Sequence, residues 1–140
     1  MAFAIDAKVA NSRLDRCREI MARHGVDVLL LSVGHDLPYL VGYHAMPLER
    51  LTMLVVPRDT DPVLVIPRLE APRVRELPGV FSLHAWGETE DPVAITARLV
   101  KESTPETRVV AVGDQMWARF LVDLMPMLSS TQYRRSVDVI

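Results

Sequence analysis

Cysteine is almost missing from this 140-residue sequence, in which Cys17 is the single example. One thiol excludes an internal disulfide framework and a zinc site built from several cysteines. Because Cys17 shares helical spacing with Leu14 and Met21, we predict that it is a small core residue. A chain of this length buries roughly two-thirds of the surface that its unfolded form exposes. That is enough for one full core, and we expect residues 1–140 to form a single domain.

Long apolar runs and blocks of basic residues are also missing. No run approaches the ~20 apolar residues that span a bilayer, and the start "MAFAIDAK" lacks the basic and apolar regions of a signal peptide. The formal net charge is −2, and the arginines are interleaved with acidic or apolar residues. Nucleic-acid binding would need a basic stripe. We therefore expect a cytoplasmic protein that binds neither membrane nor nucleic acid.

The motifs of common catalytic sites are absent as well. The sequence contains no GxSxG, GxGxxG or GxxxxGK[ST] pattern, and its 4 histidines form neither HxxxH nor HExxH. His35-Asp36 comes nearest to an acid–base or metal pair, but Asp36 is also well placed to cap the turn that follows. We interpret the pair as structural and keep a hydrolase based on it as a remote alternative. No catalytic residue and no metal site is assigned to the chain.

The segments that are present alternate between helical and strand patterns. A helix is predicted over residues 6–24, closed by Gly25. A second is predicted from Asp91-Pro92 to about residue 102, and a third after Asp114 as its cap. Short helical segments are predicted over residues 35–43 and 68–77. Strands are predicted over residues 26–32, 51–57, 62–67, 80–86 and 108–113, and residues 132–140 are predicted as a final strand or an extended exit.

The connections between these segments predict the fold class. The strands at residues 51–57 and 62–67 are joined only by the polar turn "RDTD", which favours an antiparallel hairpin. Elsewhere helices separate the strands, as in parallel sheets. We therefore expect an α/β fold in which a mixed β-sheet has helices on both faces.

One polar stretch, residues 43–50, precedes the strand at residues 51–57. It contains Tyr43, His44 and the charged pair Glu49-Arg50. Charges in this position can simply keep the start of a strand soluble. Alternatively, Arg50 presents its guanidinium to the carboxylate of a ligand. From the residues alone the two interpretations are nearly balanced, with solubility slightly favoured.

The order of several segments resembles the N-terminal domain of the prolidase, aminopeptidase P and creatinase family. In that pattern a helix ends in Gly-Val/Leu-Asp before an apolar strand, and a "YLTG[YF]" turn, an "ER" pair and a hairpin ending in proline follow. The resemblance covers nearly the whole chain. The matching positions are Gly25-Val26-Asp27, Tyr39–Tyr43, Glu49-Arg50, Pro57, Pro67, Leu69-Glu70, Trp86 and Asp91-Pro92.

The resemblance implies a ribonuclease-H-like fold for this chain and places catalysis outside it. In that family, a C-terminal pita-bread domain holds two divalent metals, commonly manganese or cobalt, on two Asp, one His and two Glu. The metal-bound hydroxide attacks an Xaa-Pro peptide bond in the peptidases. That catalytic domain is absent from these 140 residues, and the chain alone is expected to be inactive.

The resemblance also implies a role for the polar stretch. The family's N-terminal domain often packs against the catalytic domain of a second subunit, and its loops help to close the active site. Arg50 is thus expected to contact a substrate carboxylate or the neighbouring subunit, with Glu49, His44 and Tyr43 on the same rim. The expected partners are the protein's own C-terminal catalytic domain, a second subunit in a homodimer and a proline-containing peptide.

Two alternatives remain beside this interpretation. The chain could be a stand-alone binding module derived from the family, or the N-terminal domain of a creatinase-like amidinohydrolase. The reading frame beyond Ile140 distinguishes the stand-alone binding module from the N-terminal domain of a longer enzyme. About another 200–250 residues carrying Asp, Asp, His, Glu and Glu in order would establish a catalytic domain.

Overall fold

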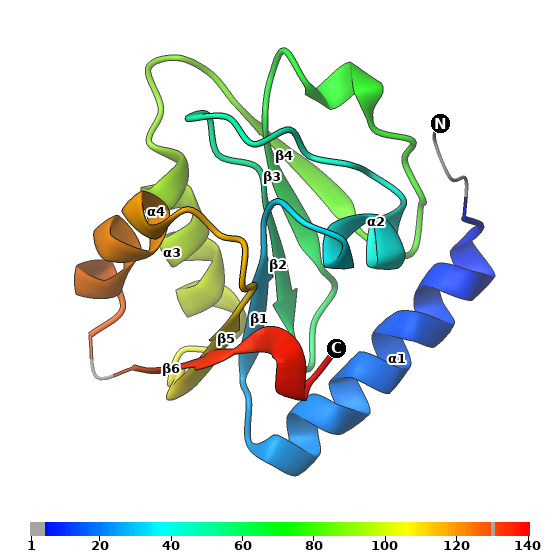
Figure 1. The fold of residues 1–140 in the computed structure, drawn as a ribbon, viewed down its shortest axis with the longest axis vertical. Helices are drawn as coiled ribbons and strands as arrows, with labels where there is room; N and C mark the ends of the chain where they lie inside the picture. The colour runs from blue at the N-terminus through cyan, green and yellow to red at the C-terminus, as the bar shows by residue number, and fades with distance from the viewer. Residues whose placement is uncertain (1–4, 130) are drawn as a thin grey trace.

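The computed structural model describes residues 5–129 and 131–140. Its centre is a six-stranded sheet with the order β4-β3-β2-β1-β5-β6 (Figure 1). The strands are β1 Val28–Leu31, β2 Met53–Pro57, β3 Val63–Pro67, β4 Ser82–Trp86, β5 Val109–Val112 and β6 Gln132–Arg135. The α-helices are α1 Ala7–His24, α2 Asp36–Val41, α3 Pro92–Ser103 and α4 Ala118–Leu124, and the short 3-10 helices are η1 Ala71–Arg73, η2 Met125–Met127 and η3 Ser136–Asp138.

Helix α1 has the ends that the sequence predicts. The Asp6 side chain accepts a hydrogen bond from the Val9 N–H at 2.8 Å, and Gly25 closes the helix with φ 69°, a left-handed conformation that favours glycine. The buried face of the helix includes Cys17, which confirms that it is a core residue. Burial raises the pKa of its thiol to about 11, so the thiol stays protonated near neutral pH.

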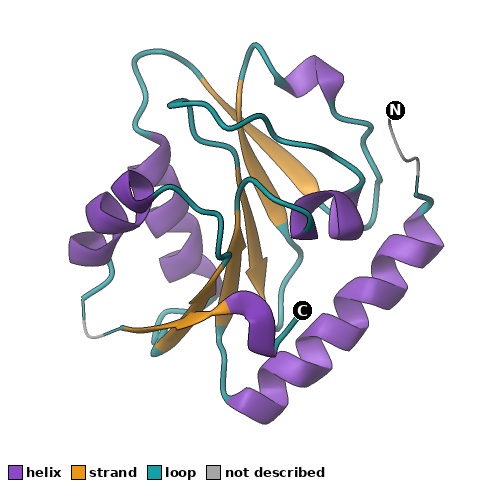
Figure 2. Ribbon diagram, in the orientation of Figure 1, coloured by secondary structure: helices purple, strands orange, loops and turns teal. Residues whose placement is uncertain are grey.

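Alternate residues of the central strands enter two separate cores. Leu29, Leu31 and Leu54 face α1 and α2, whereas Leu30 and Val55 face α3 and α4. Figure 2 shows these two pairs of helices on opposite sides of the strands. The predicted α/β fold, a mixed sheet with helices on both faces, is therefore confirmed.

Strand β2 is the reversed strand of the sheet. It pairs antiparallel with both β1 and β3, whereas the β3–β4, β1–β5 and β5–β6 pairs are parallel. The predicted hairpin is thus confirmed as β2–β3. All strands except β2 end on the same side of the sheet, which we call the carboxyl rim. The strand ends that form it are Leu31, Pro67, Trp86, Val112 and Arg135.

Asp27 joins three strands on the opposite side of the sheet. Its Oδ2 accepts hydrogen bonds from the N–H groups of Arg108 and Val109 at 2.9 and 3.0 Å. Its own N–H donates to the Val109 carbonyl, and its carbonyl accepts from the Arg58 N–H. The Arg58 guanidinium also lies 3.5 Å from Oδ1. One residue therefore ties β1 to the start of β5 and to the end of β2.

Two local predictions were wrong. The segment 68–77 forms only the single 3-10 turn η1, because the backbone becomes extended at Val74, with φ −83° and ψ 127°. Asp114 does not cap the next helix, which begins at Ala118 and has no side-chain cap. The Asp114 carboxylate instead binds the Arg135 guanidinium at 2.7 and 3.0 Å.

No helix of the described residues is both long enough and apolar enough to cross a membrane.

We predict that Asp27→Ala lowers the free energy of unfolding by about 2–3 kcal/mol, since two backbone N–H groups lose a charged acceptor. Urea denaturation of both proteins measures the loss. The matched control is Asp59→Ala, because Asp59 is exposed and pairs with the same Arg58 at 3.7 Å. The control should change stability by less than about 0.5 kcal/mol. Equal losses in the two variants would contradict the role assigned to Asp27.

Candidate functional site

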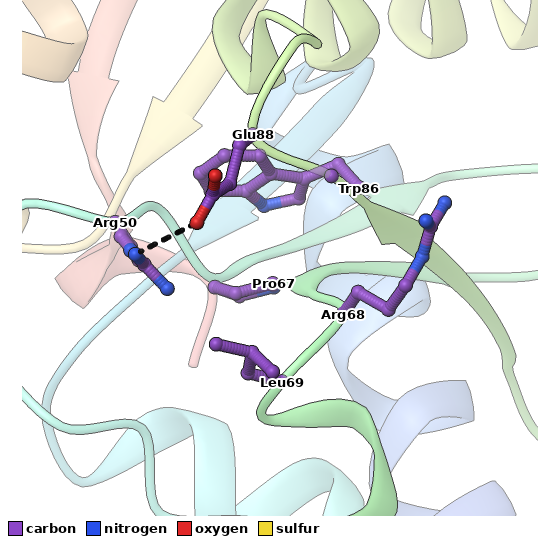
Figure 3. A pocket seen from close by; sticks show the side chains of 7 residues that line it. Arg50, Pro67, Arg68, Leu69, Trp86 and Glu88 are labelled. Atoms are coloured by element: carbon purple, nitrogen blue, oxygen red, sulfur yellow. Dashed lines mark ion pairs between the residues drawn. The ribbon is translucent and has the colours of Figure 1, made fainter.

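The main hollow of the carboxyl rim lies where β3 and β4 end and β2 begins. It is a cavity of about 560 Å³. Three loops meet there: the one that leads into β2, the one after β3 and the one after β4 (Figure 3). The residues that line it are Arg50, Pro67, Arg68, Leu69, Trp86, Gly87 and Glu88.

Arg50 directly precedes Leu51 and Thr52, the two buried residues that lead into β2. In Figure 3 its guanidinium points across the cavity toward Glu88. The distance from Arg50 Nη2 to Glu88 Oε1 is 3.6 Å, and the side chains are 44% and 85% exposed. An ion pair this long and this exposed contributes little to stability. The guanidinium is therefore open to a stronger, bidentate acceptor such as a carboxylate.

Trp86 forms an apolar wall of the cavity. Its indole Nε1–H donates to the Leu51 carbonyl at 2.9 Å, which fixes the ring next to Arg50. The ring also packs against the core beneath α3 and α4. A rigid aromatic surface thus stands beside a partly free cation.

A second arginine lies on the far side of the cavity. The Arg68 guanidinium points away from Arg50 in Figure 3 and lies 3.9 Å from Glu90 Oε1. The same Glu90 oxygen accepts the Gly87 N–H at 2.8 Å, which holds the loop after β4 in a tight turn. Each arginine of the cavity therefore has a glutamate of that one loop as its counter-ion.

The four predicted site residues lie in different surroundings. Arg50 lines the cavity, and Glu49 and His44 are exposed on the loop before it but are not part of its lining. Tyr43 is only 9% exposed and packs in the core beneath α1 and α2. Burial raises the pKa of Tyr43, and the nearby Glu70 carboxylate adds to the increase. The structure thus brings Arg50 to the cavity and leaves Tyr43 mainly a packing residue.

Sequence reasoning did not assign Arg68, Trp86 or Glu88 to the site. A usable signal was present, because each lies at the end of a predicted strand or within two residues after it. The ends of parallel strands meet at one side of a sheet. Assigning β3 and β4 as parallel neighbours would have placed the three residues together.

His35 and Asp36 border a smaller hollow of about 200 Å³, where β1, β5 and β6 end. Burial raises the pKa of Asp36, and the Asp114 charge adds to the increase. The hydrogen bond from Arg135 lowers the pKa of Asp114. His35, not Asp36, occupies the cap position of α2 and makes no side-chain cap bond, so the predicted cap is wrong. Within residues 5–129 and 131–140, no three His, Cys, Asp or Glu side chains are grouped to hold a metal ion.

The strand order and the position of the main cavity define the class of protein. It is an α/β domain with a mixed sheet whose loops form a hollow at the carboxyl ends of the strands, where such sheets commonly bind ligands.

The chain belongs to the Creatinase/Prolidase N-terminal domain family, whose model matches residues 13–130. It is 30% identical over 139 residues to the "Probable dipeptidase PepE" of Mycobacterium tuberculosis, and the match covers 93% of this chain and 36% of that protein. The chain therefore spans about a third of the length of this relative.

Solved structures agree with this assignment. Dipeptidase PepE from Mycobacterium ulcerans has a TM-score of 0.83 and 31% identity, over 98% of this chain and 37% of that one. The Creatinase/Prolidase N-terminal domain of an X-Pro dipeptidase from Streptococcus pyogenes has a TM-score of 0.72 over 89% of this chain and 99% of that one. At 24% identity, the second comparison supports the fold alone.

We predict that Arg50→Ala changes the free energy of unfolding by less than about 1 kcal/mol, because its ion pair is long and solvated. Trp86→Ala, which removes packing and the bond to Leu51, should cost at least about 2 kcal/mol. Urea denaturation measures both. A loss of 2 kcal/mol or more for Arg50→Ala would show that Arg50 serves the fold instead of a ligand.

Proposed function

We propose that this chain is the non-catalytic N-terminal domain of an Xaa-Pro dipeptidase-type metallopeptidase. Its carboxyl rim closes the active site of a catalytic domain, and Arg50 binds the free carboxylate of a proline-containing dipeptide. The observation that carries this proposal is the partly exposed Arg50 guanidinium beside the fixed Trp86 ring, in a cavity of about 560 Å³.

The chemistry of a short peptide substrate fits these groups. A dipeptide carries a carboxylate next to its second side chain, and arginine binds carboxylates through two parallel hydrogen bonds. A proline ring is apolar and packs well against an indole face. Relatives named dipeptidase favour this proposal over the amidinohydrolase alternative.

The length of the relatives, of which this chain spans about a third, supports a further domain as a partner. We propose its own C-terminal catalytic domain and a second subunit in a homodimer as the surfaces that the carboxyl rim meets. Two divalent metals, manganese or cobalt, would be held in the catalytic domain and would supply the hydroxide for peptide hydrolysis. The residues of this chain bind and orient the substrate, and Glu49 and His44 lie on the loop that adjoins the contact.

We predict that Arg50→Ala raises the KM for Gly-Pro about 10-fold to 100-fold in the protein that joins this domain to a catalytic domain. The estimate corresponds to one charge-assisted contact of about 1.5–3 kcal/mol. Steady-state kinetics with Mn²⁺ measure it. Arg75→Ala is the matched control, because Arg75 is an exposed arginine outside the cavity and should leave KM unchanged.

A second substrate isolates the carboxylate contact. Gly-Pro amide lacks the free carboxylate, so Arg50→Ala should affect its hydrolysis by less than about 2-fold, a difference below 0.5 kcal/mol. Equal effects of Arg50→Ala on both substrates would rule out carboxylate binding. The 140-residue chain alone should hydrolyse neither substrate with or without Mn²⁺, and metal-dependent turnover by it would refute the non-catalytic role.

A further inference from the structure

The loop after β3 presents an apolar side chain to the main cavity. Leu69 is 72% exposed, which makes it the most exposed large apolar side chain among the described residues. It lines the cavity of about 560 Å³ together with Pro67 and Trp86. A single exposed leucine is common on a protein surface. Leu69 differs from the other exposed large apolar side chains because none of them lines that cavity.

The polarity of the turn that carries Leu69 is the reverse of the usual one. Leu69 faces outward, whereas the neighbouring Glu70 side chain is only 20% exposed and its Oε2 atom is buried. Leucine is among the residues most often buried, and glutamate is almost never fully buried unless it is paired. The Arg73 guanidinium lies 3.4 Å from Glu70 Oε2 and supplies the counter-charge. The turn therefore holds the acid inward and the leucine outward.

Backbone hydrogen bonds fix the chain on both sides of Leu69. The Arg68 N–H donates to the Trp86 carbonyl at 2.9 Å, and the Glu70 N–H donates to the Pro67 carbonyl at 2.9 Å. The first bond ties the loop to the end of β4, and the second closes a tight turn over positions 67–70. A ligand group that packs on Leu69 therefore does not have to order the loop first, which favours binding.

The three apolar side chains of the cavity form a row next to Arg50. In Figure 3, Pro67 lies between Trp86 and Leu69, and Arg50 lies to one side of them. The proposed function places the substrate carboxylate on Arg50 and the proline ring on Trp86. The side chain of the residue before proline is then the remaining side chain of an Xaa-Pro dipeptide. Leu69, at the other end of the row, is the apolar wall left for it.

We propose that Leu69 contacts the side chain of the residue that precedes proline and gives the enzyme a preference for large apolar residues at that position. The inference rests on the proposed function, because it takes the substrate to bind in this cavity. The driving force is the burial of apolar surface. A pocket wall discriminates by about 10-fold or more for a methylene that it contacts. Glycine has no side chain at that position and cannot make the contact.

Two dipeptides test the contact in the protein that joins this domain to a catalytic domain. Leu69→Ala should lower kcat/KM about 10-fold for Leu-Pro and less than about 2-fold for Gly-Pro, since only Leu-Pro loses a contact. Steady-state kinetics with Mn²⁺ measure both values. The matched control is Val122→Ala, because Val122 is 63% exposed on α4 and does not line the cavity. The control should leave the kcat/KM ratio of Leu-Pro to Gly-Pro unchanged.

A change of preference tests the same residue through a gain instead of a loss. Leu69→Lys places a cation at this wall, where an acidic side chain before proline can pair with it. The variant should raise the kcat/KM ratio of Glu-Pro to Leu-Pro about 10-fold or more over that of the unaltered protein. Because the ratio compares two substrates of one protein, a smaller folded fraction of the variant does not change it.

Equal effects of Leu69→Ala on Leu-Pro and Gly-Pro, or an unchanged preference in Leu69→Lys, would overturn the inference. The Arg50→Ala result separates this failure from that of the proposed function. If Arg50→Ala raises the KM for Gly-Pro but not for its amide, and Leu69→Ala leaves the substrate ratio unchanged, only the Leu69 contact is refuted. If Arg50→Ala affects Gly-Pro and its amide equally, and Leu69→Ala still shifts the ratio, only the carboxylate contact is refuted.

Discussion

The carboxylate of Asp27 is the interaction on which the arrangement of the sheet depends. Strands β1 and β5 are parallel and come from distant parts of the chain, so no tight turn can align them. Asp27 aligns them directly, because one carboxylate oxygen accepts the N–H groups of both Arg108 and Val109. The Gly25-Val26-Asp27 sequence at the end of α1 therefore has a structural role: glycine ends the helix, and the acid then positions the central strand.

The directions of the strands determine where the site can form. With β1 and β5 in register and β2 reversed, the ends of β3 and β4 meet the start of β2 at the carboxyl rim. Arg50, Trp86 and Glu88 lie there although they come from different loops. The hydrogen bond from Trp86 to Leu51 makes the wall of the cavity part of the rigid sheet. The cation that faces it stays weakly paired, which is the arrangement that suits an incoming carboxylate.

The sequence predicted most of the elements because their signals are local. The caps of α1 at Asp6 and Gly25, the Asp91-Pro92 start of α3 and the β2–β3 hairpin each depend on residues within a few positions of one another. Several of the misses are non-local. Asp114 is a residue type that often caps helices, but it follows β5 and binds Arg135 at the end of the neighbouring parallel strand β6. Trp86 joins Arg50 only through the order of the strands in the sheet. Tyr43 sits in a polar stretch, yet its ring faces the core beneath α1.

The central claim is that Arg50 meets a substrate carboxylate in an active site supplied by a catalytic domain. The most direct measurement is a crystal structure of the longer protein, containing this domain and the catalytic domain, with a non-hydrolysed Xaa-Pro dipeptide analogue bound. Our account predicts that the Arg50 guanidinium lies within hydrogen-bond distance, about 2.7–2.9 Å, of the ligand carboxylate, with Glu88 displaced from it. An Arg50 that still pairs with Glu88 and faces solvent, with the carboxylate held entirely by other residues, would contradict the account.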